Sequence, residues 1–348
     1  MGGKRRAVRR VLAALTAAAA VAAVGAGPAM AGPILAIESP GNGSSTKDTT
    51  PAIRGTSSDG NPLDQVTVAI HEGSGAEGPL AQAPSTMPSL DGSWSVTPAT
   101  LADGTYTAVA EQSEVLGGPG SSPPVTFTVD TVPPVVTLET IASPTNDSTP
   151  TLEGVPGTAQ GDQPAVSVTI YTGTSVGGSV AAKGNATLSG AAWSYTSQHL
   201  VDGTYTAQAT QSDTAGNTGG SQARTFTVKT AAPQVTLEPV SSPSNDATPT
   251  LEGGAGTAEG DDREVTIDIY AGGSVGETPA VTGHVTSSGG AWSYTSTHLA
   301  DGTYTAQASQ QDSTGNTGKS APQTFTIDTT PPAVTLNAVP SPTNDATP

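Results

Sequence analysis

The sequence predicts an all-β protein built from tandem β-sandwiches, and three observations support this prediction. Conspicuous residues recur every 99 positions, as Trp94, Trp193 and Trp292 do. Apolar residues alternate with Ser and Thr in short runs, the pattern of strands that bury one face. Clusters of Gly, Pro, Asn and Asp separate these runs and mark turns. No stretch after residue 31 shows a helical period.

The repeats define the domain organisation, because a constant period indicates one structural unit per copy. The phrase "DGTYTA" begins at Asp103, Asp202 and Asp301, and "TP" recurs from Thr50 to Thr347 at the same spacing. Short connectors that contain Pro join the copies, which predicts extended, stiff linkers and a row of beads. We expect three copies and the start of a fourth, at residues 34–131, 134–230, 233–329 and 332–348.

Within one copy the alternation predicts which side chains form the core. Val166, Val168 and Ile170 fall on one side of a strand, and Tyr205 and Ala207 on one side of another. About seven short strands in about 100 residues favour an immunoglobulin-like (Ig-like) sandwich. Each Trp lies in one of these alternating runs, so we expect it in the core. An exposed Trp that binds glycans is the alternative.

The first 31 residues have the features of a secretory signal peptide. Five basic residues precede an apolar run at 11–24, which is too short to span a membrane, and Ala29 and Ala31 match the small residues before a cleavage site. Cleavage after Ala31 predicts a secreted or cell-surface protein. The chain has no cysteine, so its domains must be stable without disulfides. No later segment of the given sequence is apolar enough to span a membrane.

The charge balance excludes some partners. Removal of residues 1–31 leaves seven basic against 30 acidic residues, a net charge of −23. Such a chain is not expected to bind nucleic acid, or to bind anionic lipid by charge alone. A strongly acidic chain can still bind divalent cations.

Several phrases resemble the tandem bacterial Ig-like domains of secreted and surface-attached, adhesin-type proteins. They are "TNDSTPTLEG", "LVDGTYTAQATQSDTAGNTG" and "TFTIDTTPPAVTL", and the resemblance covers residues 35–348. It implies stalk or adhesive segments, or spacers within secreted enzymes. The first copy departs from the pattern, with "EVLGGPG" in place of "DTAGNTG". Lys229 also stands where the other connectors have Asp130 and Asp328.

No catalytic motif is apparent in the sequence. HExxH, GxSxG and P-loop patterns do not occur. His199 and His298 occupy one position of two copies, and the first copy has Thr100 there, which is typical of an exposed loop residue. We therefore expect no enzyme activity and no required cofactor.

The carboxylates offer the most specific hypothesis. In an Ig-like sandwich, loops at the end of one copy face loops at the start of the next. This would gather Asp48, Asp103 and Asp130 against Asp162 and Asp213, and then Asp147 and Asp202, with Lys229, against Asp261, Asp262 and Asp312. Ca²⁺ binds six to eight oxygens, and the resemblance implies calcium between repeats. The alternative is ordinary turn chemistry, because Asp before Thr-Pro caps local backbone groups.

The sequence thus predicts a non-enzymatic, exported repeat protein that acts as a spacer, stalk or adhesive segment at or outside the bacterial surface. Its partner would be a surface protein or glycan that the sequence does not identify. The alternative is the accessory region of a secreted enzyme, which could be carbohydrate-active, with its catalytic domain beyond residue 348. The final phrase "SPTNDATP" opens a copy elsewhere, so we expect residues 332–348 to be a truncated repeat without a sandwich to join.

Overall fold

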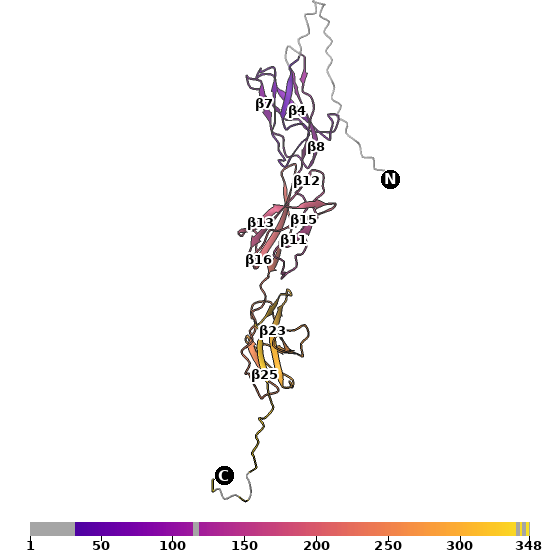
Figure 1. Cartoon of the computed structure of the whole chain (residues 1–348). Coiled ribbons are helices and arrows are strands. Elements are labelled where there is room, and N and C mark those ends of the chain that lie inside the picture. The colour runs from indigo at the N-terminus through magenta and orange to yellow at the C-terminus, as the bar shows by residue number, and fades with distance from the viewer. Residues whose placement is uncertain (1–31, 114–117, 339–341, 343–345, 348) are drawn as a thin grey trace, which may run out of the picture. The chain divides into compact units, whose positions relative to one another are not determined.

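The computed structural model describes residues 32–113, 118–338, 342 and 346–347. The predicted signal peptide lies outside these residues. All regular secondary structure in the described residues is β-strand, which confirms the predicted all-β class (Figure 1). The described residues contain no helix long and apolar enough to cross a membrane. The described chain forms two compact units, one ending at Thr131 and one starting at Val132.

The first unit is a single sandwich of two sheets. One sheet has the strand order β1-β3-β7, and the other has β2-β10-β8-β4-β5, with β6 on β4 and β9 on β8. The strands are β1 (Leu35–Ser39), β2 (Ser44–Thr46), β3 (Ile53–Ser57), β4 (Val66–Glu72), β5 (Leu80–Gln82), β6 (Ser85–Thr86), β7 (Ser93–Val96), β8 (Gly104–Gln112), β9 (Gly120–Ser121) and β10 (Val125–Val129).

The second unit contains two further sandwiches. The sandwich of residues 134–230 has sheets β11-β15-β14 and β13-β12-β16-β17, with β18 on β16. Its strands are β11 (Thr151–Gly154), β12 (Asp162–Thr172), β13 (Val180–Asn185), β14 (Thr187–Ser189), β15 (Ala192–Thr196), β16 (Gly203–Asp213), β17 (Thr218–Gly220) and β18 (Arg224–Val228).

The sandwich of residues 233–329 repeats this plan with a shorter first sheet. Its sheets are β19-β22 and β21-β20-β23-β24, with β25 on β23. Its strands are β19 (Thr250–Gly254), β20 (Asp261–Ala271), β21 (Val281–Thr286), β22 (Ala291–Thr295), β23 (Gly302–Asp312), β24 (Thr317–Lys319) and β25 (Gln323–Ile327).

Each sandwich has its own hydrophobic core, made by the residues that the alternation predicts. Val166, Val168 and Ile170 are fully buried, and Phe226 stacks on Tyr205 with ring centroids 5.8 Å apart. Trp94, Trp193 and Trp292 are at most 4% exposed, which confirms the predicted core role. A buried indole cannot serve as an exposed platform for a sugar, so this alternative is wrong for all three.

A tyrosine connects each core to the loop before β8, β16 or β23. The hydroxyl groups of Tyr106, Tyr205 and Tyr304 donate to the carbonyl oxygen four residues earlier, at 2.9, 2.8 and 3.1 Å. This bond satisfies a polar group at the core edge and holds the loop.

The segment between the first strand and the "TP" phrase pairs with the last strand of its sandwich, and in parallel. In the first sandwich β2 pairs with β10 over three residues, from Ser44 with Phe127 to Thr46 with Val129. In the other two, single parallel bridges join Thr145 to Val228 and Ser244 to Ile327. The alternation in the sequence does not reveal this pairing, because three residues are too few to show a strand pattern.

Residues 332–338 follow the last sandwich and have no regular secondary structure. Val334 and Leu336 are 89% and 93% exposed. In the second sandwich, Val136 and Leu138 occupy the corresponding positions of "AVTL" and "VVTL" and are buried. The same residue pattern thus buries its apolar side only where a sandwich receives it.

Candidate functional site

Asp48 and Asp147, both predicted as calcium ligands, are turn residues in the structure. The carboxylate of Asp48 accepts hydrogen bonds from the backbone N–H and the hydroxyl of Thr50, at 2.9 and 3.1 Å. Asp147 does the same with Thr149, at 2.8 and 3.1 Å. Each carboxylate thus fixes the turn that leads into the next strand, β3 or β11.

Asp103 and Asp202 hold the connector that leaves each sandwich. Asp103 accepts from the backbone N–H and the hydroxyl of Thr131, at 3.1 and 2.9 Å. Asp202 accepts from the same groups of Thr230, at 2.9 and 2.6 Å. The hydroxyl and N–H of Thr230 lower the pKa of Asp202, because they stabilise its charged form. The "DGT" phrase and the Thr of the connector therefore form one structural element.

Asp213 and Asp312 end β16 and β23, and both are buried. Asp213 accepts from the backbone N–H and the side-chain amide of Asn217, both at 2.8 Å. Asn316 binds Asp312 in the same way at 2.9 Å, and Thr314 adds two further bonds. Burial would raise the pKa of Asp312, but these bonds outweigh it and lower the pKa to about 2.

Asp162 and Asp261 begin the strand that pairs with this one. The structure places Asp162 opposite Asp213, and Asp261 opposite Asp312, as the first pair of each ladder. Each also closes a local turn, accepting from the backbone N–H of Ala159 or Ala258.

The two remaining predicted ligands are not part of these pairs. Asp262 is exposed, and its carbonyl oxygen accepts from Gln310. Asp130 directly follows β10, and its backbone N–H donates to the carbonyl oxygen of Thr46.

Lys229 lies against the second of these aspartate pairs. Its Nζ is 3.1 Å from Asp261 Oδ1 and 3.6 Å from Asp312 Oδ2. The side chains of Asp261 and Asp312 are 2% and 0% exposed, and that of Lys229 is 14% exposed. Burial would lower the pKa of Lys229, but the two carboxylates outweigh it and raise that pKa. The ammonium group is therefore charged where it contacts the pair.

The structure thus brings together only part of each of the two predicted sets of carboxylates. Asp162 lies beside Asp213, and Asp261 lies beside Asp312 with Lys229. Asp48, Asp103 and Asp130 belong to the first compact unit, and Asp162 and Asp213 belong to the second. Within the described residues, no three His, Asp or Glu side chains form a group that could hold a metal ion.

The histidines do not form a catalytic arrangement with these residues. His199 and His298 are exposed, as expected for loop positions. The Nδ1 of His71 lies 2.8 Å from the carbonyl oxygen of Gly78, and that of His284 lies 3.4 Å from Glu264 on the surface.

Sequence reasoning missed a buried glutamine that recurs in every sandwich. Gln211 is 2% exposed and exchanges hydrogen bonds of 2.6 and 3.0 Å with the backbone of Gly157, and donates to Gln163 at 2.7 Å. Gln310 makes the equivalent bonds, and Gln112 donates to Asp64. Their common spacing of 99 residues is the signal that could have identified them.

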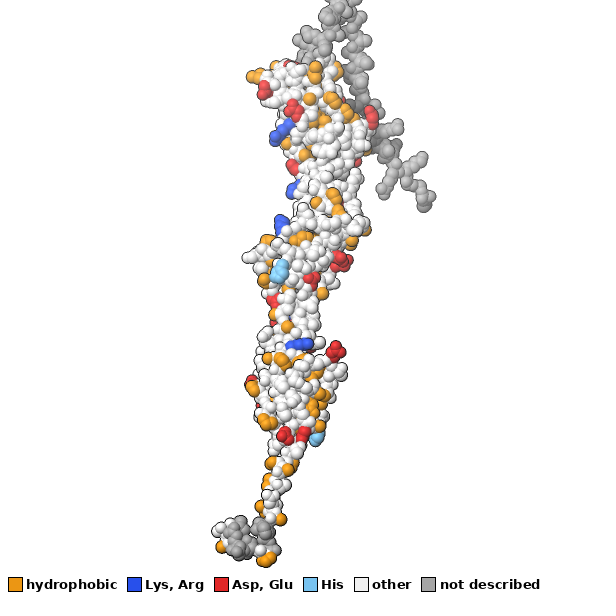
Figure 2. Space-filling model, in the orientation of Figure 1, with side chains coloured by type: hydrophobic (Ala, Val, Ile, Leu, Met, Phe, Trp, Pro, Cys, Tyr) orange, Lys and Arg blue, Asp and Glu red, His pale blue; other side chains and the backbone are white. Residues whose placement is uncertain are grey.

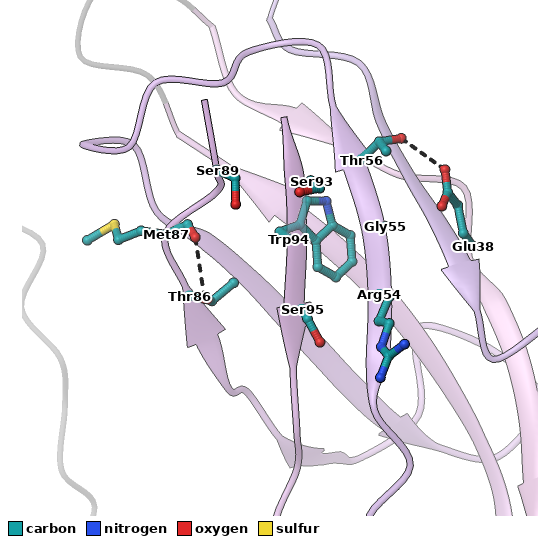
Figure 3. A pocket seen from close by; sticks show the side chains of 10 residues that line it. All are labelled: Glu38, Arg54, Gly55, Thr56, Thr86, Met87, Ser89, Ser93, Trp94 and Ser95. Carbon is teal, nitrogen blue, oxygen red and sulfur yellow. Dashed lines mark hydrogen bonds between the residues drawn. The ribbon is translucent and has the colours of Figure 1, made fainter. Parts of the chain in front are cut away.

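A shallow groove lies on the sheet β1-β3-β7 of the first sandwich, with a volume of about 420 Å³ (Figure 3). Thr56 donates to Glu38 at 3.4 Å beside it, and the Arg54 guanidinium is exposed. The indole N–H of Trp94 is buried without a partner among the described residues, whereas that of Trp193 donates to Thr137. The groove is lined by Glu38, Arg54, Gly55, Thr56, Thr86, Met87, Ser89, Ser93, Trp94 and Ser95. This set contains hydroxyl groups but no histidine to act as their base.

The face of the protein seen in Figure 2 is mostly uncharged, with acidic and basic side chains scattered singly or in small groups. It shows no extended basic patch of the kind that binds nucleic acid.

Comparison with protein families gives matches in all three sandwiches. The family model described as "Bacterial Ig-like domain" matches residues 39–131, 142–230 and 242–329. None of the curated proteins matches the chain.

Solved structures are similar over much of the chain. A tetra-tandem repeat in the extending region of a large adhesion protein is 23% identical, with 86% of this chain and 74% of that chain covered and a TM-score of 0.28. Fibronectin(III)-like modules of Clostridium thermocellum CbhA are 15% identical, with 56% and 94% covered and a TM-score of 0.33. The FN1–FN3 domains of chicken CNTN1 are 15% identical, with 86% and 98% covered and a TM-score of 0.31.

Proposed function

Because the chain belongs to the bacterial Ig-like domain family, we propose that it is a non-enzymatic segment of an exported protein, acting as a spacer or stalk, or as an adhesive segment, at or outside the cell surface. The observation that supports this most directly is the use of its polar residues. The recurring Asp, Asn, Gln, Thr and Tyr side chains bond to turns, connectors and strand ends of their own unit. In the described residues these side chains stabilise the sandwiches.

The tandem arrangement supports a spacer more than a single binding domain. Each sandwich has a separate core, and the connectors between them are anchored by Asp103 and Asp202. Adding copies of such a module lengthens the chain without altering the other modules. The proposed surface location rests on residues 1–31 and on the family.

In-frame deletions in the native cell separate the two versions of the proposal. Strains would lack residues 134–230, lack residues 233–329, or carry an extra copy of residues 134–230. Flow cytometry on intact cells would measure antibody access to an epitope tag placed after Ala31, and a second assay would measure attachment to a surface. A spacer predicts that access follows copy number, whichever copy is removed. An adhesive segment predicts loss of attachment on removing one particular copy. A tag that stays inaccessible until cells are lysed would contradict both.

Calcium at the acidic residues remains a proposal. Its support is chemical: Asp162 and Asp213 are neighbours at one end of a sandwich, and the equivalent Asp261 and Asp312 already accept a cationic group. Thermal unfolding of residues 32–348 with millimolar Ca²⁺ and with chelator tests it, because a ligand that binds only the folded form raises the midpoint. Asp162→Asn with Asp213→Asn should abolish any shift. An unchanged midpoint in the unaltered chain would end the proposal.

A further inference from the structure

We propose that Lys229 is the resident cation of the junction between the second and third sandwiches, and that it holds this junction together without a metal ion. The residues concerned, called the Lys229 clamp below, are Lys229, Asp261, Asp312, Thr314 and Asn316. This inference concerns how two repeats are joined, and it holds for a spacer and for an adhesive segment alike.

The clamp uses both the side chain and the backbone of Lys229. Lys229 directly follows β18, so it belongs to the end of the second sandwich, and its N–H donates to Thr145 there. Its carbonyl oxygen accepts from the Asn316 amide at 3.0 Å and the Thr314 hydroxyl at 3.3 Å, both in the third sandwich. One residue is thus fixed to both sandwiches by several independent bonds.

Burial makes the contact of the ammonium group with Asp261 favourable. Asp261 Oδ1 is buried and receives no hydrogen bond within the described residues other than its contact with Lys229 Nζ at 3.1 Å. An ionised carboxylate buried without a partner is strongly unfavourable, and breaking a buried ion pair costs far more than losing a surface pair. The negative charge of Asp312 lies beside it. Lys229 supplies a positive charge beside both of these buried carboxylates.

The residue that follows the last strand is basic in the second sandwich but acidic in the other two. Asp130 and Asp328 occupy the position of Lys229 after β10 and β25. The sequence thus places the positive charge at only one of the three equivalent positions, the one where the described structure shows a buried aspartate pair in contact with it.

The test measures how freely the second and third sandwiches move relative to each other in a protein of residues 32–348. Because this chain has no cysteine, Ser175→Cys and Ser274→Cys in two exposed loops allow two spin labels to be attached cleanly. Pulsed electron paramagnetic resonance then gives the distribution of distances between the labels. We compare the unaltered Lys229 with Lys229→Ala, with Lys229→Asp, and with Lys183→Ala, which removes an exposed lysine of the same repeat. Each is measured with Ca²⁺ and with chelator.

We expect a narrow distribution that calcium and chelator leave unchanged when Lys229 is present, and the same for Lys183→Ala. Lys229→Ala should broaden the distribution at least twofold in both conditions. Lys229→Asp should be broad in chelator and narrow in Ca²⁺, because three carboxylates and a backbone carbonyl oxygen would then face one another.

Three outcomes would overturn the proposal. The first is a distribution for Lys229→Ala as narrow as that of the parent, and the second is broadening of the parent by chelator. The third is an intact mass lower by one water in the parent but not in Lys229→Ala, which would mean that Lys229 Nζ has formed an amide with Asp261 or Asp312. Circular dichroism and hydrogen exchange of each variant confirm that both sandwiches remain folded, so that broadening reports on the junction.

Discussion

The hydroxyl of Tyr205 donates a 2.8 Å hydrogen bond to the carbonyl oxygen of Val201, and the ring below it stacks on Phe226. Tyr205→Phe keeps the ring and removes this bond, so it should destabilise the second sandwich by about 1 kcal/mol. Hydrogen exchange read by mass spectrometry can assign the loss to one repeat. The matched change Tyr304→Phe, where the bond is 3.1 Å and exposed, should cost less. Equal losses at both sites would contradict the role of burial.

Gly253 in β19 lies under the indole of Trp292. A methyl group there would overlap the carbonyl oxygen of Thr236 and lie 2.7 Å from Trp292 Cζ2. Neither group can move easily within a packed sandwich, so Gly253→Ala should destabilise the third sandwich by roughly 1–3 kcal/mol. Gly273→Ala is the control, because nothing lies within 4 Å of its added methyl group. Hydrogen exchange read by mass spectrometry should become faster in the third sandwich for the first variant only.

Gln211 joins the long strand β16 to the backbone near Gly157 across the end of the sandwich. Gln211→Ala leaves buried N–H and carbonyl groups without a partner, at roughly 1–3 kcal/mol for each group that water cannot reach. Gln208→Ala, which loses a single bond to Ser221, should cost less. Calorimetry of residues 32–348 should show one transition lowered for Gln211→Ala, and similar midpoints for both variants would argue against the bridging role.

Asp312 makes the stability of the third sandwich depend on pH. Its pKa falls from 3.8 to about 2 on folding, so the folded state binds the proton more weakly than the unfolded state. The stabilisation is therefore complete above about pH 4 and is lost as the pH falls through about 2. Asp312→Asn should reduce this acid dependence, leaving the part due to Asp301, whose pKa is also about 2. Hydrogen exchange at a series of acidic pH values measures the stability of the third sandwich. Equally steep dependence of this stability on pH in the parent and in Asp312→Asn would refute the prediction.

Much of the fold follows from the sequence because its signals are local and repeated. The alternation of Val166, Val168 and Ile170 identifies a strand and its buried face, and the period of 99 residues identifies the copies. Thr145 pairs in parallel with Val228 through a single bridge, and one residue pair leaves no periodic pattern to detect.

The site was less predictable, because its bonds join residues far apart in the chain. Asp202 was singled out as a possible ligand, yet its partner Thr230 is 28 residues away and satisfies its carboxylate. The sequence places Lys229 at the second junction, opposite Asp261 and Asp312. It does not show which carboxylates the ammonium group contacts, because these contacts depend on how two sandwiches meet. Gln211 carries no charge and belongs to no known motif, so only its recurrence could have identified it.

In each sandwich, the segment before the "TP" phrase pairs in parallel with the last strand, and this pairing affects how the sandwich resists a pulling force. A pull on the two ends of a sandwich slides β2 along β10, so that the bonds between them are strained together, in shear, and cannot open one at a time. The first sandwich has three such residue pairs, whereas the bridges at Thr145 and Ser244 have one each. Under tension the second and third sandwiches should therefore yield before the first.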